Sequence, residues 1–388
     1  MKNANLGISA LGTTVFEVMS TLAREHSSVN LGQGFPDDKG PIEVRRAAAD
    51  YLVEGHNQYP PMMGVAELRQ AVAEHARRFY GLDVDWQREV LVTSGATEAL
   101  ADCLFGLIEP GDEVVLLEPL YDSYLPIVRR AGGIPKLVRL EPPHWRLPRE
   151  ALAAAFGPKT KLILLNTPMN PCSKVFDADE LGFVAELCIQ HDVFAVCDEV
   201  YEHILFDGQR HIPLMTLPGM RERSVRIGSA GKTFSVTGWK VGYVTAAPDL
   251  MKPIAKTHQF MTFTTPPNLQ VGAATGLRLP DSYYESLAGE LQRKRDRLAD
   301  GLARIGFAVV PAAGTYFVTT DFRPLGFNGT DEEFCRHITE MAGVTAVPVS
   351  AFYDGAAGAP RHFVRFCFCK HDETLDAAIE RLARHFRR

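Results

Sequence analysis

The sequence lacks the features that mark disulfide-stapled, zinc-binding or membrane-spanning proteins. Its seven cysteines are scattered along 388 residues and include no Cys-x-x-Cys pair, which argues against a disulfide framework and against a zinc site. No apolar run approaches the length of a membrane span. The first residues carry one charge and no long apolar stretch before Thr13 and Thr14, so we expect no signal peptide. These absences predict a cytoplasmic protein that holds no metal and crosses no membrane.

An excess of basic charge is also missing. The chain has 41 lysines and arginines against 47 acidic residues, a formal charge of -6, whereas nucleic-acid-binding surfaces are normally basic. We find no internal repeat and no low-complexity segment. What remains is an ordinary globular composition, 46% apolar and 23% charged. At this length two domains are the usual arrangement.

From residue 88 onward, short β-rich runs each end in polar or glycine-bearing residues, and helical stretches follow. The five runs cover residues 89–92, 113–117, 161–165, 193–197 and 224–227. They are apolar without alternation, which is typical of strands in a mainly parallel sheet buried on both faces. Because ligands bind beyond the carboxyl ends of such strands, we expect the five polar clusters to share one edge of the sheet. The predicted fold class is α/β, with a mainly parallel sheet flanked by helices.

The pattern changes after Pro266 and Pro267. One long charged helix is predicted over 281–305, and short strands then alternate with helices to the end of the chain. We therefore predict a small α+β domain over 281–388, after a large α/β domain over 46–280 that carries the polar clusters. Residues 1–45 are predicted to form an N-terminal arm that joins the small domain.

The last of the five clusters contains Lys232, just past a strand end and among small residues. Desolvation and nearby cations lower the pKa of a lysine and free its amine to form an imine. Lys240 follows a Thr-Gly turn and is placed to return to the same cleft as a fixed cation. Most lysines lie solvated on loops, so these residues alone leave that alternative open.

A phosphate site is predicted at the first cluster, Ser94 to Thr97. This cluster lies at a strand-to-helix junction, where free N–H groups and the helix dipole attract phosphate. Ser229 and Lys240 would complete the site with a hydroxyl and a cation. The alternative is an ordinary helix cap.

The remaining clusters supply groups suited to an aromatic ring. Asp198 would pair with a protonated pyridine nitrogen, Asn170 and Tyr201 would donate hydrogen bonds to a ring phenolate, and Tyr121 would stack on the ring face. Each also has an ordinary interpretation, as a helix cap, a turn or a half-buried tyrosine. Five such clusters at one sheet edge favour an aldehyde-bearing aromatic phosphate as cofactor.

These motifs resemble the class I/II aminotransferases of pyridoxal 5′-phosphate (PLP) fold type I. The resemblance runs in order from residue 12 to the C-terminus and is carried by Leu31-Gly32-Gln33-Gly34-Phe35-Pro36, Asn170-Pro171, Asp198-Glu199-Val200-Tyr201, Ser229-Ala230-Gly231-Lys232 and Arg365-Phe366-Cys367-Phe368. Within the family the chain is similar to kynurenine/glutamine transaminase-like, methionine and N-succinyldiaminopimelate aminotransferases. The resemblance implies an enzyme whose large domain binds PLP.

The resemblance also implies roles for individual residues. Lys232 would form an imine with PLP and then move the substrate proton, and Asp198 and Tyr201 would be the other catalytic residues. The implied cofactor-binding residues are Ala96, Thr97, Tyr121, Asn170, Asp198, Tyr201, Ser229, Lys232, Lys240 and, from a second subunit, Tyr59. Arg365 would bind the substrate α-carboxylate as a bidentate pair, assisted by Gly34 and Asn170.

A homodimer with shared active sites is implied as well, because the family places its site at a subunit interface. Tyr59 would reach the partner's phosphate, and Phe263 and Thr264 would enter the partner's substrate pocket. Phe16 would cover the substrate side of the site. The chain departs from its relatives at two places. At Met169 relatives commonly have Asn or His, and at Cys172-Ser173 they commonly have Thr-Gly.

The predicted reaction moves an amino group from an L-amino acid to a 2-oxo acid such as 2-oxoglutarate. No basic cluster marks a second carboxylate, and the aromatic residues predict a bulky or apolar donor such as kynurenine, methionine, phenylalanine or glutamine. The alternatives are an N-succinyldiaminopimelate aminotransferase and a β-lyase of cysteine S-conjugates. A PLP-sensing regulatory module is disfavoured, since only about forty residues precede the core.

Overall fold

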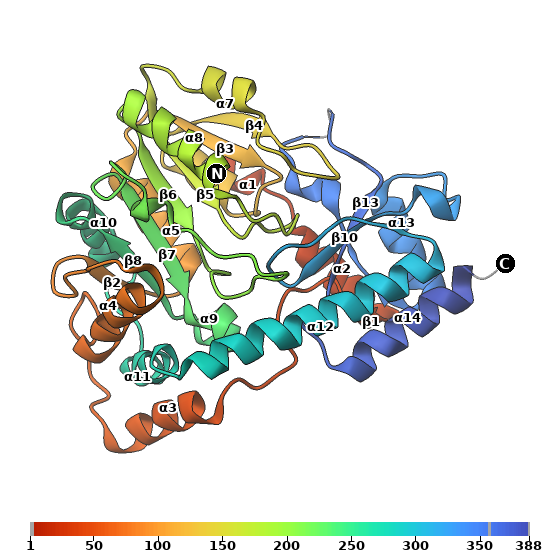
Figure 1. Cartoon of the computed structure of the whole chain (residues 1–388), viewed down its shortest axis with the longest axis horizontal. Coiled ribbons are helices and arrows are strands. Elements are labelled where there is room, and N and C mark those ends of the chain that lie inside the picture. Colours follow the sequence, from red (N-terminus) through yellow and green to blue (C-terminus); the bar gives the residue numbers. More distant parts are fainter. Residues whose placement is uncertain (1–3, 356–357, 387–388) are drawn as a thin grey trace.

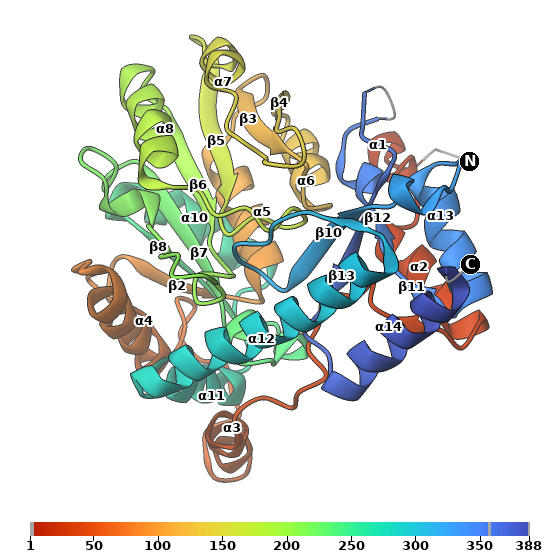
Figure 2. The ribbon, with the colours of Figure 1, turned by 45° about the vertical axis from the view of Figure 1, so that its right-hand side comes forward.

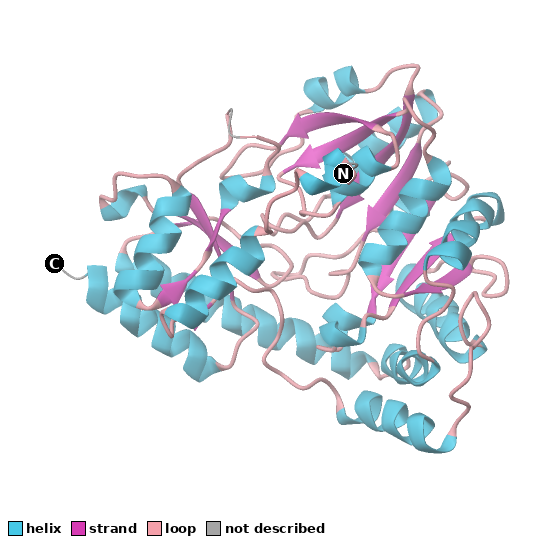
Figure 3. Cartoon of the chain, turned by 180° about the vertical axis from the view of Figure 1, so that it is seen from behind, coloured by secondary structure: helices cyan, strands magenta, loops and turns pink. Residues whose placement is uncertain are grey.

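The structure is a computed structural model and describes residues 4–355 and 358–386. Its strands gather in two places, a large sheet and a group of smaller sheets, and helices surround both (Figure 1; Figure 3). Within the described residues, no helix combines the length and the apolar character needed to cross a membrane.

The large sheet has seven strands in the described part of the chain. In spatial order they are β2 (Val90–Thr93), β8 (Gly242–Ala246), β7 (Ser224–Ser229), β6 (Phe194–Asp198), β5 (Thr160–Asn166), β3 (Glu113–Glu118) and β4 (Ile134–Arg139). β8 is antiparallel to both of its neighbours, and the other pairs are parallel. The prediction of an α/β fold with a mainly parallel sheet is confirmed. The five strands that precede the polar clusters point the same way, so their carboxyl ends meet at one edge.

The helices cover both faces of this sheet and the smaller sheets beside it. They are α1 (Leu6–Ser9), α2 (Val15–Glu25), α3 (Ile42–Glu54), α4 (Ala66–Tyr80), α5 (Ala96–Leu107), α6 (Tyr124–Arg130), α7 (Arg149–Ala155), α8 (Ala178–Gln190), α9 (Ala230–Thr233), α10 (Pro248–Met261), α11 (Pro267–Leu277), α12 (Asp281–Ile305), α13 (Asp331–His337) and α14 (Asp372–Phe386). Four 3-10 helices lie in the described residues, η1 (Leu214–Thr216), η2 (Thr237–Trp239), η3 (Arg323–Leu325) and η5 (Val349–Phe352), and η4 (Ile338–Ala342) is a π-helix.

Successive side chains of a strand point to opposite faces of the sheet, and helices cover both faces. The strands are therefore apolar without alternation. In β5, Leu162 and Leu164 pack in the core that contains α5 and α10, whereas Ile163 and Leu165 pack in the core that contains α8. Local signals set the helix ends. A capping box between Asp177 and Glu180 begins α8.

The smaller sheets lie beside the C-terminal helices. Their strands are β12 (Val347–Pro348), β13 (Phe363–Cys367), β10 (Phe317–Asp321) and β9 (Ala308–Val309) in one sheet, and β1 (Val29–Asn30) paired with β11 (Val344–Thr345) in another. α12 runs from beside α11 to α14 (Figure 2). Met19, Leu22 and Leu31 of the N-terminal segment pack in the same core as α12 and α14. The N-terminal segment therefore packs with the C-terminal part of the chain.

Candidate active site

A cavity of about 290 Å³ opens at the carboxyl edge of the large sheet. The predicted site residues that line it are Phe16, Gly34, Ala96, Thr97, Tyr121, Asn170, Asp198, Tyr201, Ser229, Lys232, Lys240 and Arg365. Three others, Tyr59, Phe263 and Thr264, do not line it. The fold thus brings side chains from both ends of the sequence to one place.

Lys232 lies in α9, directly after β7 ends. Its Nζ is 5.7 Å from the ring centroid of Tyr201 and 5.9 Å from that of Tyr316. Burial lowers the pKa of Lys232, and the pull of Asp198 and nearby thiols opposes this only in part. A lysine in such surroundings releases its proton more readily, as a nucleophilic amine requires.

Asp198 ends β6, and its carboxylate is buried. The Tyr124 hydroxyl donates to Oδ2 at 2.6 Å, and the Val200 amide donates to Oδ1 at 3.4 Å. Asn166 fixes the same turn by donating to the Asp198 carbonyl at 2.9 Å. Burial raises the pKa of Asp198, while the bond from Tyr124 acts against the rise. Burial disfavours the charged form of the carboxylate because water no longer stabilises it. A cationic ring nitrogen beside the carboxylate would stabilise that charged form.

Tyr124 and Asn166 were not among the predicted site residues. The sequence shows both as polar residues near predicted strand ends. It does not show their contacts with Asp198, which lies 74 residues from Tyr124 and 32 residues from Asn166.

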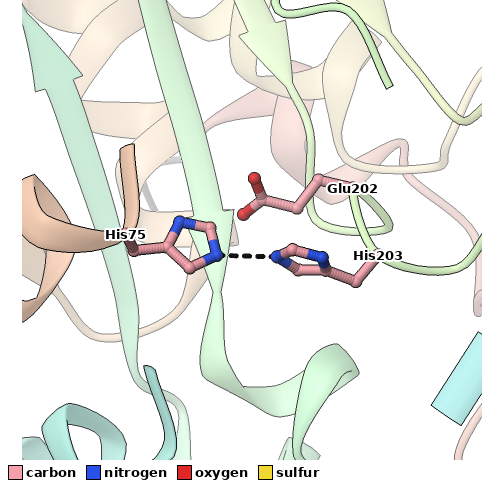
Figure 4. Close-up of side chains that lie close together, drawn as sticks. All are labelled: His75, Glu202 and His203. Atoms are coloured by element: carbon pink, nitrogen blue, oxygen red, sulfur yellow. Dashed lines mark hydrogen bonds between the residues drawn. The ribbon is translucent and has the colours of Figure 1, made fainter. Parts of the chain in front are cut away.

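The residues that follow Asp198 are held in place by buried ion pairs between Arg226 and two carboxylates, those of Glu199 and Glu202. Arg226 donates to Glu199 at 2.6 Å and to Glu202 at 2.9 Å. His75 and His203 approach each other with their Nε2 atoms 2.6 Å apart beside Glu202 (Figure 4). These two histidines and Glu202 resemble a set of metal ligands, but a guanidinium already contacts the carboxylate and disfavours a second cation there. We interpret the group as structural.

The first cluster forms a turn suited to phosphate. Gly95 has a φ of +81° and precedes the first turn of α5, whose first residues are Ala96 and Thr97. A Cβ atom at Gly95 would lie 3.2 Å from the Lys240 Nζ, so the cation stands directly beside the turn. Free N–H groups at a helix N-terminus with an adjacent ammonium fit a phosphate group.

The Arg365 guanidinium is buried and held from several sides. Nη1 donates to Asn170 Oδ1 at 2.7 Å, and Nη2 donates to the Gly32 carbonyl at 3.0 Å. Nε has no hydrogen-bond partner among the described residues. Burial lowers the pKa of Arg365 to about 10, so the group stays cationic at neutral pH. An unpaired buried N–H on a cation that lines the cavity fits an anionic ligand.

Asn170 contacts Arg365 directly, and the expected help of Asn170 and Gly34 in binding the substrate carboxylate stays a prediction. Both residues line the cavity, Asn170 beside the guanidinium and Gly34 at the wall. The Gly34 carbonyl accepts a hydrogen bond from Tyr316 at 2.9 Å, and the direct backbone contact with Arg365 comes from Gly32. A Cβ atom at Gly34 would lie 2.6 Å from the Phe317 ring, so this wall of the cavity requires glycine.

Phe16 closes the cavity on the side of the arginine. Its ring centroid lies 5.3 Å from Arg365 Cζ and packs edge-on to Phe352 at 5.8 Å. Tyr59 and Phe263 instead form an edge-on pair at 5.7 Å outside the cavity, with Tyr59 83% exposed and Phe263 40% exposed. Their expected role in a partner's site stays a prediction.

Met169, Cys172 and Ser173, the positions expected to differ from relatives, do not line the cavity. Met169 is buried in the core that contains α8. The Ser173 hydroxyl donates to the Phe317 carbonyl at 2.8 Å and is hydrogen-bonded to Thr315. Ser173 therefore contacts a wall of the cavity, whereas Met169 lies in the neighbouring core.

Comparison with known proteins agrees with this geometry. The family model for aminotransferase class I and II matches residues 27–382. The chain belongs to the class I and II aminotransferases. It is 45% identical over 380 residues to a probable N-succinyldiaminopimelate aminotransferase of Mycobacterium tuberculosis, covering 96% of each chain. It is 38% identical over 410 residues to a kynurenine–oxoglutarate transaminase of Dictyostelium discoideum, covering 96% of this chain and 94% of the relative.

A solved structure extends the comparison to the fold. The crystal structure of an Escherichia coli protein with a methionine aminotransferase function superposes with a TM-score of 0.95 at 39% identity. The superposition covers 99% of this chain and 100% of the other. This aminotransferase is therefore an enzyme that acts on amino and 2-oxo acids.

Proposed function

We propose that this aminotransferase uses PLP, held by Lys232, to move an amino group from an L-amino acid with an uncharged side chain to a 2-oxo acid, for which 2-oxoglutarate and pyruvate are the acceptors to compare. The observation that carries the proposal is one cavity lined by the Lys232 amine, the Asp198 carboxylate and the Arg365 guanidinium, beside the N-terminus of α5. When bound, PLP supplies an electron-withdrawing ring that stabilises negative charge on the donor's α-carbon.

The protein's own residues bind and orient the reactants. The α5 N-terminus and Lys240 would hold the phosphate, and Asp198 would keep a proton on the ring nitrogen. Arg365 would bind the donor's α-carboxylate, which places the α-carbon toward Lys232. The Lys232 amine, whose pKa is lowered by burial, would then remove and return the α-proton.

The preference for uncharged donors rests on the cations around the cavity. Among the described residues, Lys232, Lys240 and Arg365 are the basic side chains that line it, and each already has a role. Phe16 and Phe317 make the neighbouring wall apolar. Donors such as methionine, kynurenine, phenylalanine or glutamine fit this wall without leaving a charge unpaired.

N-succinyldiaminopimelate is the second candidate donor, because the Mycobacterium tuberculosis relative that is 45% identical bears that name. It would need a further cation for its distal carboxylates. A panel of donors with 2-oxoglutarate and pyruvate as acceptors separates the two candidates by kcat/KM.

We also propose a homodimer. Large apolar side chains are exposed near the end of α3 and the end of α10, namely Val53 (82%), Tyr59 (83%), Phe260 (81%) and Met261 (57%). An exposed apolar surface of this kind is typical of a subunit interface.

We also propose a cytoplasmic location. The cysteines of the chain are buried free thiols, which supports this proposal.

Two experiments test these proposals. Purified protein loaded with PLP should show the visible absorbance of an imine, which shifts on adding a donor and is absent in Lys232→Ala but kept in Lys252→Ala, an exposed lysine of α10. Mixing inactive Lys232→Ala with weakened Tyr59→Ala should restore activity, since the hybrid dimer contains one intact site. A protein without the visible band would refute the cofactor, and no recovery on mixing would refute the shared site.

A further inference from the structure

His258 lies on α10 and is fully buried, with both ring nitrogens facing hydrogen-bond acceptors. Nδ1 is 2.8 Å from Glu98 Oε1, and Nε2 is 3.1 Å from the Met62 carbonyl oxygen. A carbonyl oxygen accepts hydrogen bonds but cannot donate one, and the same holds for an ionised carboxylate. The ring therefore satisfies both neighbours when both nitrogens carry protons. This geometry indicates an imidazolium cation.

The ionisable groups around the ring agree with a cation. Among the described residues, those that face it are Glu98 and Asp102, both on α5, and the loop opposite offers the neutral Met62 carbonyl. Asp102 Oδ2 lies 3.6 Å from Nδ1. Burial alone would lower the pKa of His258, but the hydrogen bond that Glu98 accepts and the negative charge of both carboxylates raise it to about 9.

Glu98 connects this cation to the phosphate turn. It is the third residue of α5, and its Oε2 accepts the backbone N–H of Ser94 at the start of the turn. A bare carboxylate in this position would repel a phosphate dianion at the same helix N-terminus. The adjacent imidazolium cancels that charge while the carboxylate still holds the backbone.

The same group of side chains holds the segment after α10. The Thr262 hydroxyl donates to Glu98 Oε1, and the hydroxyls of Ser94 and Thr265 are 2.8 Å apart. Because several hydrogen bonds meet at Glu98, the orientation of its carboxylate is fixed. His258 is one of the groups that hold Glu98 in the orientation in which it accepts the Ser94 N–H.

We propose that His258 is a positioning residue for the phosphate turn: its imidazolium neutralises Glu98 and holds it against Ser94, so that the turn accepts the phosphate of the cofactor as a dianion. The inference rests on the proposed use of PLP. His258 does not line the cavity, and it acts through Glu98.

The test compares PLP with pyridoxal, which has the same ring and aldehyde but no phosphate. In His258→Gln the dissociation constant of PLP should rise about tenfold, as expected for an unbalanced charge near a helix N-terminus, while that of pyridoxal stays unchanged. In Glu98→Gln/His258→Gln, which removes both charges, most of the PLP affinity should return. His26→Gln, an exposed histidine of the N-terminal segment, is the matched control and should alter neither constant.

A second measurement examines the cation in the wild-type protein. NMR of protein with isotope-labelled histidine should show His258 as an imidazolium at pH 8, and the preference for PLP over pyridoxal should decline as the pH rises above about 9. Because both measurements use the wild-type protein, they test the proposal even if the His258→Gln variant does not fold.

The outcomes separate the two proposals. A wild-type protein that binds neither compound refutes the proposed function, and the role of His258 with it. A wild-type protein that binds PLP refutes the role of His258 alone if His258→Gln weakens both compounds equally or neither. It also refutes that role if His258 is not an imidazolium at pH 8.

Discussion

The Arg365 guanidinium lies against the face of Phe317, with Cζ 3.8 Å from the ring centroid. An aromatic face attracts a cation and also excludes water from it. With Asn170 on Nη1 and no partner on Nε, the cation is held in one orientation but is not neutralised by a salt bridge to a described residue. We expect a substrate carboxylate to act as its counter-ion, which would define where the α-carbon of the donor lies.

Arg365→Lys should lower kcat/KM for the amino donor by about a hundredfold, mainly through KM, because lysine cannot offer the paired N–H groups of the planar guanidinium. The absorbance of bound PLP should remain, since Arg365 does not hold the cofactor. Arg323→Lys is the control, an exposed arginine paired with Asp321. An unchanged KM in Arg365→Lys would show that the α-carboxylate binds elsewhere.

Tyr124→Phe should weaken PLP binding about tenfold, the effect of losing a hydrogen bond to a charged group. The Tyr124 hydroxyl opposes the rise that burial causes in the pKa of Asp198. Without it the pKa rises further, so the carboxylate is neutralised at a higher pH and the variant's affinity should fall more steeply toward acid. Equilibrium dialysis across the pH range measures this. Tyr51→Phe, on α3, serves as control, and parallel pH curves would contradict the assigned role.

Gly242→Ala should loosen the phosphate turn. A Cβ atom there would lie 2.6 Å from the Gly95 carbonyl carbon and 2.8 Å from the Ala96 nitrogen, and backbone atoms cannot move aside as a side chain can. We expect about 1–3 kcal/mol of lost stability, as for other overpacked sites, together with weaker PLP binding. Gly238→Ala, where a Cβ atom meets nothing within 4 Å, should behave like wild type. Thermal unfolding with and without PLP distinguishes the two variants.

Much of this arrangement follows from the sequence because parallel strands end at one edge. Lys232 and Asp198 directly follow apolar runs, so their meeting in one cavity is predictable from the α/β pattern. The antiparallel direction of β8 was not predicted, since an apolar run does not encode strand direction. The division of the chain at residues 45 and 280 stays a prediction.

The residues that escaped prediction act through distant contacts. His258 meets Glu98 across 160 residues and the Met62 carbonyl across 196. In the sequence it is one histidine on an amphipathic helix, for which a core position is the ordinary expectation. Its charge state depends on neighbours that only the folded chain brings together.

The buried histidine pair beside Glu202 predicts a loss of stability in acid. Burial, together with the Arg226 charge and against the pull of Glu202, lowers the pKa of His75 to about 4 and that of His203 to about 3. The unfolded chain takes up these protons below the ordinary histidine value of 6.5, whereas the folded chain does not until near pH 4. The stabilisation is therefore complete above pH 6.5 and is lost as the pH falls toward 4.

For His75 this shift corresponds to about 3 kcal/mol. Since carboxylates titrate in the same range, the quantity to measure is the difference in the free energy of unfolding between wild type and His75→Gln, from urea unfolding at several pH values between 4 and 7.5. His75→Gln should be less stable at pH 7, because a hydrogen bond is lost, but should lose less stability toward acid. His144→Gln, an exposed histidine, should keep the wild-type slope. An equal slope in His75→Gln would mean that His75 takes up its proton at the same pH in the folded and the unfolded protein, so that its pKa is not lowered by folding.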